Sequence, residues 1–289
     1  MSLEKRYMLF ISLICISFIF TANGTLSETP KSAPSKHFVL VHGACHGAWS
    51  WFKLVPLLKS SGHNVTALDL GASGVDPRQA MDLRSISDYF QPLRHFMASL
   101  PHHERVILVG HSYGGLAISQ AMEYFPDKVS VAVFISALMP GPALNISTIN
   151  QEIRRRAVPE LDDKYTFANG TSNAPATFTF GPLELATKLY QLSSAEDLTL
   201  ATMLMRPLPL FTEADISNEL RLSKQNYSSV KRVFIVLEYD LIYQKDFQLW
   251  MIKKNPPNEV KLVLSDHMVI VSHTKMLLPH LLDVAKKYG

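Results

Sequence analysis

The sequence predicts an α/β fold, in which a mostly parallel sheet is covered by helices on both faces. Segments rich in Val, Ile and Leu alternate along the chain with segments whose apolar residues recur at helical spacing. The apolar segments are nearly uninterrupted, which is typical of strands buried on both faces. The chain has 289 residues, of which 47% are hydrophobic and 18% are charged, so it is long enough to bury a sizeable core.

Local signals place the individual elements of this fold. The expected strands cover residues 37–41, 65–68, 106–109, 129–136, 231–237 and 260–264. The expected helices cover residues 52–61, 85–100, 116–123, 247–253 and 274–288. Ser85 is expected to cap the second of these helices, with Asp88 at the capping-box position.

The alternation of strands and helices breaks between about residues 140 and 228. This stretch contains seven prolines, several Met and Phe residues, and only short helical candidates at 183–191 and 195–205. We interpret it as a cap inserted over the carboxyl edge of the sheet, so that residues 37–289 form one domain with an insertion. Its apolar side chains, with Met139 and Phe180 among them, are expected to line a substrate pocket. Alternatively, about half of them pack the core of the cap itself.

The N-terminus has the composition of a targeting segment. Lys5 and Arg6 precede an apolar run from 7 to 20, and small residues follow, so residues 1–24 are predicted to be a cleavable signal peptide. An uncleaved signal anchor is the alternative. Residues 25–36 are expected to be a flexible lead-in. The protein would then enter the secretory pathway, with the apoplast or an endomembrane lumen as destination, and without stable insertion in the membrane. Its glycosylation motifs are at Asn23, Asn64, Asn145, Asn169 and Asn226, and the best candidates are Asn145, Asn169 and Asn226.

Composition argues against several other classes of protein. The net charge is only +3, and the one dense basic run, 154–156, suits a solvated helix face better than a nucleic-acid site. Cleavage of the signal would remove Cys15 and leave Cys45 without a disulfide partner. His42 and His46 are four apart, but in a glycine-rich turn, so neither a metal nor a cofactor is expected. A small-molecule substrate is expected, and a homodimer is left open.

Residues 106–123 predict a catalytic serine. An apolar strand runs into Gly-His-Ser-Tyr-Gly at 110–114 and continues as a helix, which is the pattern of a nucleophile elbow. The turn holds Ser112 in a strained conformation, and its small neighbours let strand and helix approach closely. The amide of Tyr113 is expected to point towards a developing oxyanion.

A base and an acid follow in the order that this arrangement requires. A serine hydroxyl needs an adjacent base, and the base needs an orienting acid. Asp240 and His267 each come just after an expected strand and complete the set with Ser112. Glu238 is the alternative acid. Asp266 is interpreted as a turn residue, because it would point away from its neighbour, and His111 as a packing residue.

A further glycine-rich loop follows the first strand. It reads His-Gly-Ala-Cys-His-Gly-Ala-Trp over residues 42–49, and the amide of Ala44 is expected to be the second oxyanion donor.

These segments resemble the plant methylesterase family, the salicylic acid-binding protein 2-like and polyneuridine aldehyde esterase-like α/β-hydrolases. The resemblance lies in residues 37–51, 62–70, 106–115, 188–198, 229–236 and 265–268. It implies an α/β-hydrolase fold with the triad on Ser112, Asp240 and His267 and an oxyanion amide on Ala44. It also implies hydrolysis of methyl esters of small plant acids of the salicylate, jasmonate or indole-3-acetate type.

Two alternatives to an esterase remain open. Related hydroxynitrile lyases carry Thr and Lys where this chain has Gly43 and Met268, so these two pocket positions favour the esterase. A receptor that uses the same pocket with slow turnover is the second alternative. The chain departs from the family at Tyr239 and Leu241, which flank the acid, and in the cap around 150–176.

Overall fold

The computed structural model describes residues 35–156, 159–168, 170, 174 and 176–289. The predicted signal peptide, most of the lead-in, Cys15, Asn23 and Asn169 lie outside the described residues. Within the described part, no helix has the length and apolar character needed to cross a membrane.

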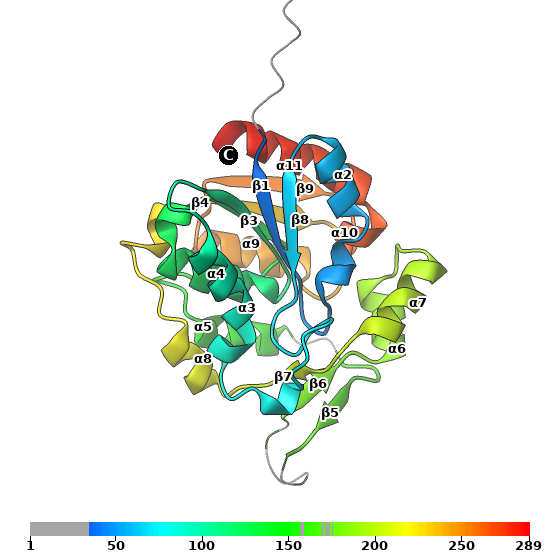
Figure 1. Ribbon diagram of the computed structural model, residues 1–289. Coiled ribbons are helices and arrows are strands. Elements are labelled where there is room, and N and C mark those ends of the chain that lie inside the picture. The colour runs from blue at the N-terminus through cyan, green and yellow to red at the C-terminus, as the bar shows by residue number, and fades with distance from the viewer. Residues whose placement is uncertain (1–34, 157–158, 169, 171–173, 175) are drawn as a thin grey trace, which may run out of the picture. The chain divides into compact units, whose positions relative to one another are not determined.

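A six-stranded parallel sheet forms the centre of the domain (Figure 1). Its strands, in spatial order, are β2 (Asn64–Leu68), β1 (His37–Val41), β3 (Val106–His111), β4 (Val129–Ile135), β8 (Lys231–Leu237) and β9 (Glu259–Val263). Every neighbouring pair is parallel. The six expected strands are therefore all present, two of them with the predicted bounds. The parallel order brings the carboxyl ends of all six to one edge of the sheet.

Helices cover both faces of the sheet. Alternate residues of β3 point into two different hydrophobic cores. Val106 and Leu108 belong to the first core, and Ile107 and Val109 belong to the second. The first core is closed by α3 (Ile86–Ser99), α4 (Gly114–Tyr124) and α9 (Lys245–Lys254). The second is closed by α2 (Leu54–Ser60), α10 (Val269–Ser272) and α11 (Thr274–Tyr288). Burial on both faces explains why the four inner strands, β1, β3, β4 and β8, are apolar at nearly every position.

The insertion between β4 and β8 differs from expectation. It contains α5 (Ile146–Arg155), α6 (Pro182–Glu184), α7 (Ala195–Leu204) and α8 (Glu213–Glu219). It also contains a three-stranded antiparallel sheet of β5 (Lys164–Thr166), β6 (Thr177–Thr179) and β7 (Leu208–Pro209), which the sequence did not predict. The helix predicted over 183–191 is present as helical backbone from Pro182 to Leu189, but it is not one α-helix, because α6 ends after one turn and passes into a π-helix, Leu185–Leu189. The insertion lies beyond the carboxyl ends of the central strands (Figure 1).

Short 3-10 turns complete the fold at Ala48–Trp51, Ala80–Asp82, Pro126–Lys128 and Tyr227–Ser229. One capping detail also departs from the prediction. Ser85 Oγ accepts a hydrogen bond from the Asp88 amide, as expected, but the Asp88 carboxylate accepts from the Arg84 amide and not from Ser85. The reciprocal bond of a capping box is therefore displaced by one residue.

Candidate active site

Ser112 lies in the tight turn between β3 and α4. Its φ angle is 55°, which is a strained, left-handed conformation for a residue with a side chain. Its carbonyl accepts hydrogen bonds from the amides of Gly115 and Leu138, which hold this conformation. A Cβ at Gly114 would lie 2.5 Å from the carbonyl oxygen of His42, so only glycine lets α4 begin this close to the loop after β1. The side chain of Ser112 is thereby presented at the carboxyl edge of the sheet.

Ser112, His267 and Asp240 form an unbroken hydrogen-bonded line. His267 Nε2 lies 2.9 Å from Ser112 Oγ, and His267 Nδ1 lies 2.7 Å from Asp240 Oδ2. A carboxylate only accepts, so Nδ1 carries the ring proton and Nε2 is free to accept the serine proton. All three residues are buried, and the hydrogen bonds therefore act away from bulk water.

The Asp240 carboxylate is held by four hydrogen-bond donors. Besides His267, the Ser136 hydroxyl donates to Asp240 Oδ2 over 2.6 Å. The amides of Ile242 and Tyr243 donate to Oδ1 over 2.7 and 2.8 Å. These bonds compensate the burial of a carboxylate that is 2% exposed and fix which oxygen faces the base.

The competing residues lie elsewhere. The Glu238 carboxylate lies 2.8 Å from Lys245 Nζ and makes no hydrogen bond to His267. Asp266 is buried but directs its carboxylate to Ser272 Oγ and to the amide of Leu192.

His111 is buried beside the base. Its Nε2 donates to the carbonyl of His267 over 2.8 Å, and the two rings are 4.8 Å apart. Burial lowers the pKa of His111 well below the ordinary value, so it stays neutral and does not oppose positive charge on His267. Its contacts are those of a packing residue that also supports the loop of the base.

The loop after β1 faces Ser112. A Cβ built on Gly43 would lie 2.9 Å from Ser112 Cβ and 3.3 Å from Ser112 Oγ. Among the described residues, no hydrogen bond within the protein uses the amide of Ala44 or Tyr113. Two unpaired amides from neighbouring loops are what an oxyanion hole requires.

His42 orients one of these amides. Its Nε2 accepts from the Leu70 amide over 3.0 Å, so its Nδ1 carries the proton and donates to the Gly43 carbonyl over 2.8 Å. That carbonyl and the Ala44 N–H belong to one planar peptide unit and point in opposite directions. Holding the carbonyl therefore fixes the direction of the Ala44 N–H. The sequence analysis considered His42 only as a metal ligand and rejected that role, so this orienting role was not predicted.

The remaining predicted pocket residues are apolar and mostly buried. Met139 is fully buried, Met268 is 1% exposed beside the base, and Phe180 packs against both cores. Their contact with substrate stays a prediction. Within the described residues, no group of three His, Cys, Asp or Glu side chains is placed to hold a metal ion.

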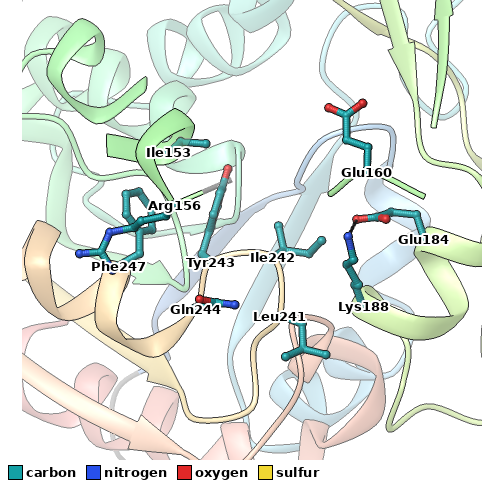
Figure 2. A pocket seen from close by; sticks show the side chains of 10 residues that line it. All are labelled: Ile153, Arg156, Glu160, Glu184, Lys188, Leu241, Ile242, Tyr243, Gln244 and Phe247. Atoms are coloured by element: carbon teal, nitrogen blue, oxygen red, sulfur yellow. Dashed lines mark ion pairs between the residues drawn. The ribbon is translucent and has the colours of Figure 1, made fainter. Parts of the chain in front are cut away.

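A cavity of about 180 Å³, which we call the outer cavity, lies beside the loop of the acid (Figure 2). Figure 2 shows Tyr243 and Ile242 between Arg156 on one side and the Lys188–Glu184 ion pair on the other. The ring of Tyr243 also lies 5.6 Å from that of His267, nearly at right angles. Tyr243 thus lies between the base and the outer cavity. No signal in the sequence indicated this residue, because it follows the acid by three positions in an irregular loop.

Comparisons with known proteins agree with this geometry. The family model described as "Alpha/beta hydrolase family" matches residues 38–277. Methyl jasmonate esterase 1 of Vitis vinifera is 52% identical over 256 residues, covering 88% of this chain and 98% of the relative. Salicylic acid-binding protein 2 of Nicotiana tabacum is 46% identical over 258 residues, covering 88% and 98%.

A solved structure is similar to this chain in both sequence and fold. It is a variant of tomato Methylketone Synthase I complexed with beta-ketoheptanoate, 53% identical, with a TM-score of 0.85 over 89% of this chain and 99% of that chain. The predicted fold and family are confirmed, and the relatives named as esterases support an esterase. The chain belongs to the α/β hydrolase family and, within it, to the plant methylesterases.

Proposed function

We propose that this esterase cleaves methyl esters of small plant acids through a covalent acyl intermediate on Ser112. The observation that carries the proposal is the buried line from Ser112 Oγ through His267 to Asp240, with contacts of 2.9 and 2.7 Å. An unpaired amide at Ala44 lies on the loop that faces this serine.

The chemistry follows from the hydrogen-bond roles. His267 Nε2 takes the proton of Ser112 as Oγ attacks the ester carbonyl, and Asp240 stabilises the imidazolium that forms. The amides of Ala44 and Tyr113 bind the oxyanion. As the tetrahedral intermediate collapses, the bond from the acyl carbon to the methoxy oxygen breaks, and His267 gives its proton to that oxygen, so methanol leaves. A water molecule, activated by His267, attacks the acyl group, and the acid leaves with Ser112 restored.

Three features support small, apolar methyl esters as the substrates. The relatives are named for methyl jasmonate and for salicylic acid. Ser112 is only 6% exposed, so an ester must enter an enclosed site to reach it. The residues predicted to line the pocket, Met139, Phe180 and Met268, are apolar.

A panel of esters tests this proposal. The purified protein is incubated with methyl jasmonate, methyl salicylate and methyl indole-3-acetate, and with the ethyl and benzyl esters of the same acids. The released acid is measured by mass spectrometry, with Ser112→Ala as the control. Faster cleavage of at least one methyl ester than of its larger homologues is expected. Absence of cleavage of every ester by the parent protein would contradict the proposal.

The same samples test the other functions. A receptor is indicated if Ser112→Ala and the parent bind the free acid equally while neither cleaves an ester. Similarity to a methylketone synthase complexed with beta-ketoheptanoate makes β-keto acids a second candidate substrate class. A methylketone released from 3-oxoheptanoate would support that candidate, and cyanide released from mandelonitrile would support a lyase.

We also propose that residues 1–24 direct the protein into the secretory pathway, as their basic and apolar segments suggest. Asn145 is exposed and Asn226 half-buried. Asn145 Oδ1 caps α5, so its motif is best removed by Ser147→Ala, which leaves the cap intact. A mass shift on glycosidase treatment that is lost when Ser147→Ala, Thr171→Ala and Ser228→Ala are combined supports the proposal. An unprocessed, unglycosylated chain in plant cells would contradict it.

A further inference from the structure

The ring of Tyr243 has the catalytic base on one side and the outer cavity on the other. It lies 5.6 Å from the ring of His267 at an angle of 86°, so the edge of one ring meets the face of the other. The same side chain lines the outer cavity, together with apolar side chains of α5, α9 and the loop of the acid (Figure 2). At this place, one aromatic side chain therefore separates the base from the outer cavity.

The hydroxyl of Tyr243 lies at the catalytic serine. Burial raises the pKa of this phenol above its ordinary value, and a hydrogen bond with Ser112 offsets part of that rise. The phenol therefore keeps its proton at neutral pH, and its polar end borders the space in which an ester carbonyl would be attacked. A substrate group that extends from this space towards the loop of the acid meets the ring of Tyr243.

The backbone of Tyr243 is held independently of its side chain. Its amide donates to Asp240 Oδ1 over 2.8 Å, and its carbonyl accepts from Gln248 Nε2 over 2.6 Å. The ring also packs against that of Phe247, at 5.6 Å. Because both hydrogen bonds use main-chain atoms, they remain when the side chain is replaced. A smaller residue at position 243 would therefore remove the ring without releasing the acid.

The outer cavity suits an uncharged, apolar chain. Each charged side chain that lines it already has a partner within the protein. The pairs are Arg156 with Glu152 and Asp246, Lys188 with Glu184, and Glu160 with the hydroxyl of Tyr165. The apolar side chains that line it are Ile153, Leu241, Ile242 and Phe247. A charged ligand would have to compete with these pairs, whereas an apolar chain would gain from burial against the apolar side chains.

We propose that Tyr243 limits the length of the acid portion of the ester, because its ring closes the catalytic site against the outer cavity. The inference rests on the proposed hydrolysis at Ser112. Methanol contributes a single carbon, so an extended part of the substrate belongs to the acid. With the ring in place, a chain that extends in this direction ends at Tyr243. Without the ring, the chain continues into the outer cavity and buries further methylene groups there.

Methyl esters of unbranched acids, from butanoate to decanoate, measure this limit. In Tyr243→Ala, the ratio of kcat/KM for methyl octanoate to that for methyl butanoate should exceed the parent ratio by at least about tenfold, since each buried methylene contributes about fourfold and at least two more are admitted. Tyr243→Phe is the matched control. It loses the hydroxyl near Ser112 but keeps the ring, so its ratio should equal that of the parent. An unchanged ratio in Tyr243→Ala, or an equal gain in Tyr243→Phe, would overturn the proposal.

Filling the outer cavity from its far side tests where the longer chain lies. Ile153 is half-buried and lines the cavity from α5. Ile153→Trp should leave the ratio of the parent unchanged and should cancel the gain in Tyr243→Ala. Thermal unfolding verifies that the variants fold, and Ile153→Phe takes the place of Ile153→Trp if that variant does not. A gain that persists with the cavity filled, or that occurs for longer alkoxy groups and not for longer acids, would contradict the proposal.

Binding measurements test the role of Tyr243 without turnover. Butanoate and octanoate are the acid products of the same esters, and isothermal titration calorimetry gives the Kd of each. The ratio of the two Kd values should shift towards octanoate in Tyr243→Ala by the same factor as kcat/KM, and should not shift in Tyr243→Phe. A parent that cleaves no ester contradicts the proposed function, whereas an unchanged ratio of Kd values in Tyr243→Ala contradicts the role of Tyr243.

Discussion

Replacing Asp240 by Asn should move the ring proton of His267 from Nδ1 to Nε2. Oδ1 of Asp240 accepts from two backbone amides, so an amide nitrogen placed there would face two donors. The Asn nitrogen must therefore take the place of Oδ2 and donate to His267 Nδ1. The ring proton is then forced onto Nε2, which lies 2.9 Å from Ser112 Oγ and can no longer accept the serine proton. The negative charge that stabilises the imidazolium is lost as well.

The expected loss is large because both effects act on the transition state. A wrong tautomer with intact geometry lowers kcat by about 10⁴, or about 5.4 kcal/mol of barrier. The assay is the steady-state cleavage of a methyl ester that the parent protein cleaves, with thermal unfolding to verify that the variant folds. Glu238→Gln is the matched control, since the Glu238 carboxylate pairs with Lys245 and is expected to be dispensable. A folded Asp240→Asn variant within tenfold of the parent would show that the proton on His267 is not set by Asp240.

Two further predictions concern the loop after β1 and the buried histidines. Gly43→Ala should lower kcat about 10- to 100-fold in a folded protein, because the new Cβ would lie 2.9 Å from Ser112 Cβ and displace the nucleophile; unchanged kinetics would contradict this. The free energy of unfolding should fall as the pH drops from about 6.5 towards 4, measured by urea titration at several pH values. Burial lowers the pKa of three buried histidines, so above about pH 6.5 their contribution is complete, and below it the unfolded chain takes up protons that the folded chain does not. His46 alone, with a pKa of about 4, accounts for up to about 3.4 kcal/mol of this loss, and a flat profile would contradict the assignment. The three residues are His42, His46 and His111.

The sheet could be predicted from the sequence because most of its strands are buried on both faces. Burial on both faces produces apolar runs such as 231–237, whose ends coincide with those of β8. The structure then brings Ser112, Asp240 and His267 together because parallel strands end at one edge. The number of residues that separate them along the chain does not predict how far apart they lie in space, but the fold class does.

The insertion could not be predicted in the same way. Its strands have two or three residues, such as Leu208–Pro209, which is too short for a period of two to be visible. The contact between His46 and Tyr190 joins residues 144 positions apart and depends on where the insertion docks. Ser136, which donates to Asp240, was assigned to the end of a strand. Ser136 comes at the carboxyl end of an expected strand, at the same edge of the sheet as Ser112, Asp240 and His267. This position was the one signal of its role.

Hydrolysis by this mechanism requires that Ser112 becomes acylated during turnover. Acylation is observed by intact-protein mass spectrometry of samples quenched with acid within milliseconds of mixing with a cleaved ester, followed by peptide mapping. We predict a mass increase equal to the acyl group less one hydrogen, located on the peptide that contains Ser112, absent in Ser112→Ala and accumulating in Asp240→Asn only slowly. Turnover of the ester with no acyl adduct at Ser112, or with an adduct on another residue, would contradict the assignment of Ser112 as the nucleophile.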